Sequence, residues 1–391
     1  LQTFMVGVGG GGRFEAFTEA GARTPVAVLP RTTQPIIAPL VSVDLIVITP
    51  ARWALELDPL VSFRRSQGWS VEVVELEAIF DEFGGGRETT DAIREFLSQA
   101  WFEWPAPAPS AVLLVGDATY DPSGNLGHSS LQVLPTRLIE TPYLEAASDH
   151  WFGDVEGMDG ISELVVGRFP VSTREECRGV VEKIVDHETR GILVSGLSVF
   201  ASDDEADFLG LSAMVAARLP AGTPSSFIEI GTQPIADLQT ALRQDWRAGA
   251  ETVHYTGHGS RLSWASEEIL TVPDVATLVG PRLPVVTAMN CLNGYFLHRE
   301  TPSLGEALLL EPDAGAVAYW GPTAITSHLA QQQLALEFYE RLYSAPGVTL
   351  GEAIRTAEKA LAGTQQTSKE SWRTHLETWI LFGDPMTRVR Y

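Results

Sequence analysis

Cysteine is scarce in this sequence, since Cys177 and Cys291 are the only two among 391 residues. Two cysteines form at most one bridge, which excludes a disulfide framework as the basis of the fold. Hydrophobic runs are short as well, because no stretch approaches the roughly 20 consecutive apolar residues of a membrane-spanning helix. A secretory leader pattern is also lacking and the sequence starts at Leu1, so we expect a mature fragment of a longer protein.

Basic residues are outnumbered, with 27 Lys and Arg against 50 Asp and Glu and a formal net charge of −23. This balance argues against a nucleic-acid-binding protein, which needs a basic face. It favours solubility, and it would also attract basic substrates or calcium, an ion that prefers oxygen ligands. Apolar residues make up 45% of the chain, which is ample for the core of a soluble globular protein.

The length of the chain fits two domains, and its composition changes along the sequence. Residues 1–40 contain a glycine run at 9–12 and prolines at 25, 30, 35 and 39. We interpret this segment as a linker or a remnant of a pro-segment. A repeating pattern then follows in two sets, which predict an N-terminal subdomain at 41–190 and a second subdomain at 191–391.

Short apolar runs rich in Val and Ile alternate with amphipathic segments from Asp44 onward. The runs lie at 45–48, 71–76, 111–115, 164–166, 197–201, 252–256, 285–289 and 316–319. Runs of this length are typical of strands that are buried on both faces. Ile93, Phe96, Leu97 and Ala100 fall on one face at helical spacing. Alternating strands and helices predict an α/β fold with mostly parallel sheets flanked by helices.

Polar residues follow two of the predicted strands directly. His258 comes after the run at 252–256 and is flanked by Gly257 and Gly259, which let the backbone turn sharply. Cys291 comes just after the run at 285–289. Neighbouring strands lie about 4.8 Å apart, so adjacent strands here would project both side chains from one carboxyl edge, where ligands bind in open parallel sheets.

A thiol and an imidazole at one edge are the parts of a nucleophilic catalyst. The imidazole of His258 can draw the thiol of Cys291 toward thiolate, or protonate a leaving amine. The backbone N–H groups of Gly259 and Cys291 would point into the same space and could hold an oxyanion. Cys177 lies in a charged helical stretch without a partner, so we interpret it as structural.

Rival motifs are weaker. Gly7, Gly9 and Gly12 match a dinucleotide-binding pattern, but too little chain precedes them for a first strand. His254 and His258 have the spacing of a helical zinc pair, but this segment is predicted to be a strand. No serine nucleophile motif of the G-x-S-x-G type occurs. The acidic run at 203–207 follows a predicted strand, and it is either solvated surface or part of the site.

The segments around His258 and Cys291 resemble the gingipain family of cysteine peptidases, relatives of the caspases. They read Tyr255-Thr-Gly-His-Gly-Ser, followed by Trp264, and Asn290-Cys-Leu-Asn-Gly. The sequences at 114–121, 148–150, 166–169 and 379–385 are similar to the family as well. The resemblance covers about 44–391, and it implies a caspase-like fold of two side-by-side subdomains, the second of them catalytic.

The resemblance also implies roles for individual residues. Cys291 and His258 would form the catalytic dyad, with an oxyanion hole from the amides of Gly259 and Cys291. The family has an acidic residue that orients the histidine, and its position corresponds to Asp204 here.

Substrate-binding residues are implied in the same way. Some members cut after Arg or Lys by means of an aspartate, for which Asp207 is the nearest candidate in this sequence. A tryptophan that covers that pocket in one member corresponds to His328, and Trp264 is a further substrate-binding candidate.

We therefore expect a cysteine endopeptidase that forms a thioester with protein or peptide substrates and needs no cofactor for catalysis. The family implies structural calcium at an unknown site and a secreted or cell-surface location. Two alternatives stay open at this point: a sortase-like transpeptidase that processes secreted proteins, and a catalytically silent binding module of the same fold.

Overall fold

The computed structural model describes residues 33–122, 124–126, 132–190, 196–298, 300–364 and 369–389. Residues 34–391 belong to one compact unit. Most of the segment at 1–40 lies outside the described residues, and 33–40 contain neither helix nor strand. Its interpretation as a linker or pro-segment therefore stays a prediction. None of the described helices is long and apolar enough to cross a membrane.

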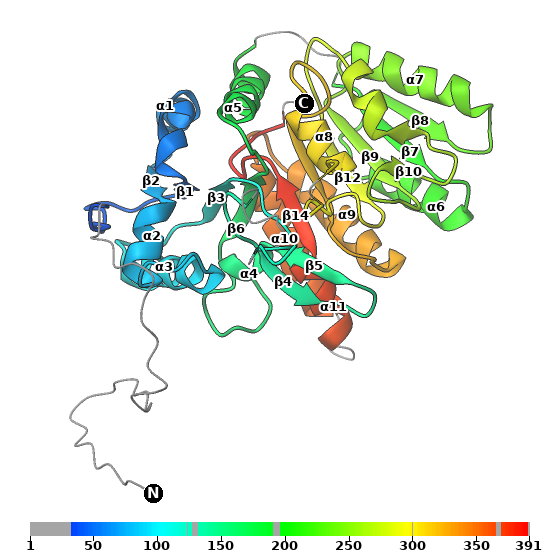
Figure 1. Cartoon of the computed structure of the whole chain (residues 1–391). Helices are drawn as coiled ribbons and strands as arrows, with labels where there is room; N and C mark the ends of the chain where they lie inside the picture. The colour runs from blue at the N-terminus through cyan, green and yellow to red at the C-terminus, as the bar shows by residue number, and fades with distance from the viewer. Residues whose placement is uncertain are drawn as a thin grey trace, which may run out of the picture. The chain divides into compact units, whose positions relative to one another are not determined.

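Ten strands of the described chain form one sheet, in the order β2-β1-β3-β6-β14-β13-β12-β9-β7-β8 (Figure 1). The first-half strands are β1 (Leu45–Thr49), β2 (Val71–Glu75), β3 (Ala111–Val115) and β6 (Val165–Phe169). The second-half strands are β7 (Ser198–Ser202), β8 (Ser225–Glu229), β9 (Thr252–Thr256), β12 (Val285–Met289), β13 (Ala318–Pro322) and β14 (Trp379–Phe382). All neighbours pair in parallel except β13 and β14.

Helices connect most of these strands. They are α1 (Asp58–Ser66), α2 (Leu76–Phe83), α3 (Thr90–Glu103), α4 (His150–Gly153), α5 (Arg174–Thr189), α6 (Ala206–Ala216), α7 (Ile235–Arg247), α8 (Leu304–Leu310), α9 (His328–Leu342), α10 (Leu350–Thr364) and α11 (Lys369–Glu377). Two 3-10 helices, η2 (Ala51–Leu57) and η4 (Val272–Thr277), and two small antiparallel pairs, β4 (Arg137–Glu140) with β5 (Glu145–Ser148) and β10 (Ser263–Trp264) with β11 (Leu270–Thr271), complete the described elements.

The predicted fold class is confirmed, since a large and mostly parallel sheet is flanked by helices. Each of the eight predicted apolar runs overlaps a strand of this sheet. First-half strands occupy one side of the sheet and second-half strands the other, with β6 and β14 at the junction. The predicted boundary between 190 and 191 falls between α5 and β7 in sequence, and the division into subdomains there stays a prediction.

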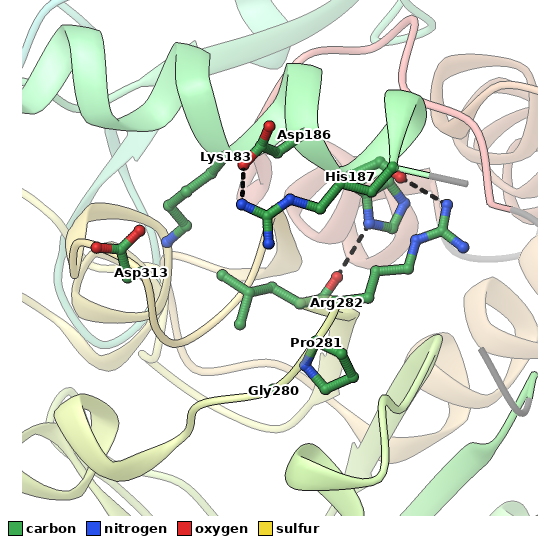
Figure 2. Close-up of a pocket in the computed structure, with 9 residues that line it drawn as sticks. Lys183, Asp186, His187, Gly280, Pro281, Arg282 and Asp313 are labelled. Carbon is green, nitrogen blue, oxygen red and sulfur yellow. Dashed lines mark hydrogen bonds and ion pairs between the residues drawn. The ribbon is translucent and has the colours of Figure 1, made fainter. Parts of the chain in front are cut away.

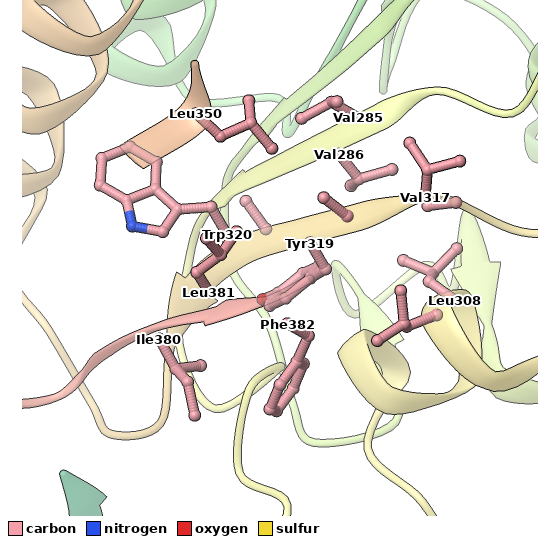
Figure 3. Close-up of a cluster of buried hydrophobic side chains, with 14 of the residues drawn as sticks. Val285, Val286, Leu308, Val317, Tyr319, Trp320, Leu350, Ile380, Leu381 and Phe382 are labelled. Atoms are coloured by element: carbon pink, nitrogen blue, oxygen red, sulfur yellow. The ribbon is translucent and has the colours of Figure 1, made fainter. Parts of the chain in front are cut away.

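Buried side chains on β12, β13 and β14 anchor the centre of the sheet (Figure 3). Tyr319 on β13 stacks on Phe382 of β14, with ring centroids 5.9 Å apart, and Trp320 stacks on Phe338 of α9 at 4.7 Å. Full burial of one large apolar side chain contributes roughly 1.5–3 kcal/mol. This packing fixes the positions of β12 and β13, and therefore of the two segments that follow these strands.

A buried arginine joins two of the family-like segments in the first half, 166–169 and 148–150. Arg168 on β6 donates to both carboxylate oxygens of Asp149, at 2.6 and 2.9 Å. It also donates to the carbonyls of Gly116, Leu134 and Pro135. A buried charge is tolerated only when it is paired and hydrogen-bonded. These residues therefore hold the fold together at the carboxyl edge of β3 and β6.

Candidate active site

The carboxyl ends of β7, β9 and β12 lie at one level of the sheet. Thr256 at the end of β9 pairs with Met289 of β12 on one side and with Ser202 of β7 on the other. His258 and Cys291 each lie two residues beyond these paired ends. β9 and β12 are adjacent, which meets the condition for both side chains to project from one edge. The connection between these strands contains β10, β11 and η4 in place of an α-helix.

Both glycines beside His258 are required by close backbone approach. A Cβ atom at Gly257 would lie 2.5 Å from the Cβ of Asp203, and one at Gly259 would lie 2.5 Å from Nδ2 of Asn290. Contacts this short are not tolerated, so only glycine fits at either position. The loop after β9 can therefore lie directly against the loops after β7 and β12.

The backbone of His258 is fixed at both of its polar groups. Its N–H donates to Oδ2 of Asp203 at 3.0 Å, and its carbonyl accepts from the hydroxyl of Tyr255 at 2.6 Å and from the N–H of Ala265 at 2.9 Å. The indole of Trp264 stacks flat on Tyr255, with centroids 4.4 Å apart.

Trp264 itself is fully buried. The expectation that its side chain contacts a substrate is therefore corrected, because the indole packs inside the protein and braces the loop that carries His258.

The acidic residue at the imidazole is Glu205, which corrects the expectation of Asp204. Oε1 of Glu205 lies 2.9 Å from Nε2 of His258. The nearby Asp203 also contacts the histidine loop, since its Oδ2 accepts from the N–H of His258. Asp204 lies between these two acids in the sequence, and its Cβ lies 3.5 Å from where a side chain at Gly231 would begin.

Aromatic rings extend the site from His258 toward α9. Phe208 on α6 packs edge-on against His258 at 5.4 Å and against His328 at 5.3 Å between ring centroids. The ring of Phe208 thus contacts both His328 and His258, the predicted catalytic histidine. Asp207 is exposed in the first turn of α6, where a carboxylate complements the helix N-terminus.

Cys291 occupies a half-buried position on a strained turn. Its Sγ lies 3.8 Å from the carbonyl oxygen of Thr326, in the segment after β13. The next residue, Leu292, has a φ of 65°, a left-handed conformation that costs a non-glycine residue roughly 1–2 kcal/mol. Such strain is often found at functional sites, where surrounding contacts enforce it.

Two asparagines that the sequence analysis did not single out tie the cysteine loop to the histidine loop. Asn290 donates to Oδ1 of Asn293, and Nδ2 of Asn293 donates to the carbonyls of Ser260 and Ser263. Both asparagines are fully buried. Both asparagines flank Cys291 in the sequence, and this position could have identified them as functional. Buried amides at a strand end serve to fix loops.

The backbone N–H groups of Gly259 and Cys291 donate to no other group within the described ranges. Free N–H groups at the end of a sheet can donate hydrogen bonds to an oxyanion. Cys177, by contrast, is fully buried in α5, and burial with the nearby Glu56 raises the pKa of its thiol to about 12. It stays a thiol at neutral pH, in keeping with a structural residue.

A separate polar cavity of about 180 Å³ lies near the starts of β12 and β13, at the opposite edge of the sheet (Figure 2). Lys183 of α5 donates to the carbonyl of Leu309 in α8 and to those of Glu311 and Ala314 beyond it, at 2.7–2.9 Å. Arg282 donates to Glu251 and to the carbonyl of His187. These cations already have protein partners, so the cavity has a structural role.

Comparison with known proteins adds the family. The model of peptidase family C25 matches residues 38–390. Gingipain R2 of Porphyromonas gingivalis is 24% identical over 383 residues, which cover 88% of this chain and 46% of that protein. Lys-gingipain HG66 of the same organism is 22% identical over 292 residues, covering 71% of this chain and 15% of that protein.

Solved structures agree on the fold. The crystal structure of the Arg-specific cysteine proteinase gingipain R superposes with a TM-score of 0.72 at 21% identity, covering 92% of this chain and 80% of that one. A complex of the pro- and mature domains of RgpB from Porphyromonas gingivalis gives the same TM-score at 22% identity, covering 89% and 80%. The chain spans less than half the length of the curated relatives that it matches. Because the family model covers most of the sequence, the chain belongs to peptidase family C25.

Proposed function

We propose that this protein is a cysteine endopeptidase in which Cys291 is the nucleophile and His258 its acid and base. The observation that carries the proposal is the level pairing of the ends of β9 and β12. It is supported by Asn293, which joins the two loops beyond those ends through Ser260 and Ser263. Nucleophile and base must be held on one rigid support to act together.

The reaction follows from these positions. The sulfur of Cys291 attacks the peptide carbonyl carbon, a C–S bond forms, and the C–N bond then breaks as the imidazolium of His258 protonates the leaving amine. Water next attacks the thioester while His258 accepts its proton, which releases the acid and restores the thiol. The free amides of Gly259 and Cys291 would stabilise the oxyanion in both steps.

Glu205 would act on the histidine. Its contact with Nε2 stabilises the imidazolium and leaves the other ring nitrogen to exchange the proton. Phe208 packs against the same ring and limits its rotation. We therefore propose that Glu205 and Phe208 position the histidine.

A preference for Arg or Lys before the cleaved bond is the finer part of the proposal. It is supported by the acidic run after β7, in which Asp204, Glu205 and Asp207 are exposed and Glu205 contacts His258. The net charge of −23 would also attract basic substrates. Relatives include proteins described as Arg-specific and as a Lys-gingipain. His328, next to Phe208, would border the same space.

Structural calcium is a further part of the proposal. Asp203, Glu205 and His258 bring three ligand atoms within 4.8 Å of one another, but calcium takes six to eight oxygens, so a ring nitrogen fits poorly. Asp154 fits better, because its Oδ1 is buried without a hydrogen-bond partner in the described chain. Asp159 and Glu163 lie in the same loop.

By family resemblance we also propose a secreted or cell-surface location.

The dyad is tested with three variants. Cys291→Ala and His258→Ala should each abolish hydrolysis of a denatured protein substrate while the melting temperature stays within a few degrees of the parent. A thiol-directed probe should label the parent and not Cys291→Ala. Cys177→Ala is the matched control, since its thiol is buried, and it should retain both labelling and turnover. Normal turnover by Cys291→Ala would refute the proposal.

A further inference from the structure

A second cavity, of about 780 Å³, lies beside the segment after β13 whose Thr326 contacts Cys291. Its walls come from three separate parts of the chain: Pro142 and Tyr143 at the tip of the β4–β5 hairpin, the segment after β13 with Ile325, and α11 with Arg373 and His375. Binding cavities for small ligands have volumes of about 300–1,000 Å³. This one is therefore large enough for an amino-acid side chain with its neighbouring backbone.

Thr326 connects the cavity to the nucleophile. It lines the cavity, and its carbonyl oxygen lies 3.8 Å from Sγ of Cys291. Its hydroxyl donates to the carbonyl of Asn290 at 2.9 Å, so the wall and the cysteine loop are held together. A chain bound at Cys291 can therefore continue into the cavity.

The order of the strands determines which half of a substrate would enter. β13, from whose end Ile325 and Thr326 follow, lies beside β12 on the side away from β9. His258 follows β9 and must reach the leaving amine. The leaving amine is thus on the side of His258, and the acyl residues upstream of the one before the bond can continue past Thr326 toward the cavity.

The polar groups of the cavity are engaged with one another. Nε of Arg373 lies 2.9 Å from Oε1 of Glu377, one helical turn away. Nε2 of His375 accepts from the N–H of Ser327 at 2.8 Å and lies 3.1 Å from its hydroxyl. These pairs leave the apolar side chains as the surface that a ligand would cover.

Two of those side chains are exposed to solvent, although large apolar groups are usually covered. Tyr143 is 70% exposed and Ile325 is 38% exposed. The tip that presents Tyr143 is well fixed, since Thr141 accepts from the N–H of Leu144 and donates to its carbonyl. Both side chains line the same cavity, and exposed apolar groups that gather in one place are typical of ligand-binding grooves.

We propose that this cavity binds an apolar side chain of the acyl half of a polypeptide substrate, between Tyr143 and Ile325. The inference rests on the proposed peptidase function and adds a determinant of substrate choice to it. The hairpin would make the first half of the chain part of the substrate site. The binding energy would come from apolar area that Tyr143 and Ile325 lose to water when the side chain enters.

The test is a set of fluorogenic acyl peptides with one leaving amine and one residue before the bond, in which each of the next three upstream positions is Leu, Ser, Lys or Glu. We expect one position at which Leu raises kcat/KM about tenfold over Ser, as is usual for filling an apolar pocket. Tyr143→Ser and Ile325→Ser should each reduce that ratio to below about threefold, because the apolar area that favours Leu is removed.

Matched controls are Phe102→Ser and Leu55→Ser, which remove exposed apolar side chains from α3 and η2 and should keep the tenfold ratio. If the parent cleaves the peptides but both cavity variants keep the parent's ratio, the subsite is wrong and the peptidase proposal stands. An apolar preference only in the leaving half would also overturn it. Failure of the parent to cleave any peptide or protein would instead refute the peptidase function itself.

Discussion

Glu205 contacts the imidazole of His258 at 2.9 Å, whereas the Cβ of the adjacent Asp204 lies beside Gly231. Both side chains of the pair are solvent-exposed, at 66% for His258 and 48% for Glu205. An exposed ion pair contributes only about 0.2–1 kcal/mol. The contact therefore orients the ring more than it stabilises the fold.

The first prediction separates these two acids. Glu205→Gln should lower kcat/KM about two- to fivefold in the absence of further burial by substrate, because an exposed pair of this kind is lost. Asp204→Asn, the matched control, should leave kcat/KM unchanged. A loss of kcat/KM in Asp204→Asn with none in Glu205→Gln would assign the orienting role to Asp204.

The second prediction concerns basic specificity. If Asp207 pairs with a substrate guanidinium, Asp207→Asn should reduce kcat/KM for Arg peptides by about one to two orders of magnitude, the value of a charge-assisted hydrogen bond. Peptides with an apolar residue before the bond should be unaffected. A parent enzyme that prefers apolar or acidic residues there would contradict the proposed preference, and an Arg preference that survives in Asp207→Asn would assign it to another carboxylate.

The third prediction concerns His375, whose Nε2 holds the segment next to Cys291 through Ser327. His375→Phe should slow alkylation of Cys291 and lower kcat severalfold, because the N–H of Ser327 loses its acceptor. His375→Gln retains an acceptor and should recover most of the loss. Equal behaviour of the two variants would exclude a role for this hydrogen bond.

The fourth prediction tests calcium by thermal unfolding. A chelator should lower the melting temperature and added calcium should restore it, since a ligand that binds only the folded state stabilises it. Asp154→Asn should be less stable than the parent in calcium and respond less to the chelator. Asp207→Asn, outside the loop, should respond like the parent. An unchanged melting temperature of the parent on chelation would count against bound calcium.

The fifth prediction is a pH dependence of stability. His254 is fully buried, its Nε2 has no partner in the described chain, and burial lowers its pKa to about 3. The unfolded chain takes up this proton near pH 6.5 and the folded chain does not. The free energy of unfolding should therefore fall by about 1.4 kcal/mol per pH unit from this residue alone as the pH decreases from 6.5 toward 3.

His254→Asn is the matching variant, because its amide can still meet Thr287, which lies 2.9 Å from Nδ1 of His254. In urea unfolding at pH 4–7, the free energy of unfolding should change less steeply with pH than in the parent, by the equivalent of one bound proton. A variant with the parent's slope would show that this histidine does not titrate between the two states.

Much of the fold could be predicted because buried parallel strands are nearly continuous apolar runs. The run that became β9 was located to the residue. β8 was missed because it begins with Ser225 and Ser226 and its residues are mostly accessible to solvent. The residues of β14 are apolar, but the strand pairs with β6 of the first half and β13 of the second half. Such pairing depends on contacts between residues distant in sequence.

The site was predictable where chemistry and position coincide. His258 and Cys291 follow apolar runs directly, so their types and places pointed to the same edge. Glu205 could not be chosen over Asp204 without the direction in which each side chain leaves the backbone. Trp264 was misassigned for a similar reason, since an indole inside a functional segment gives no sign of whether it faces a substrate or the core.

β14 has a further consequence during protein synthesis. It is the latest strand in the described sequence, yet it lies in the middle of the sheet between β6 and β13. Until the ribosome has released residues 379–382, both neighbours expose unpaired edges, which are prone to associate with other chains. A proteolytic activity that depends on the finished sheet would then be withheld until β14 has left the ribosome and paired with β6 and β13.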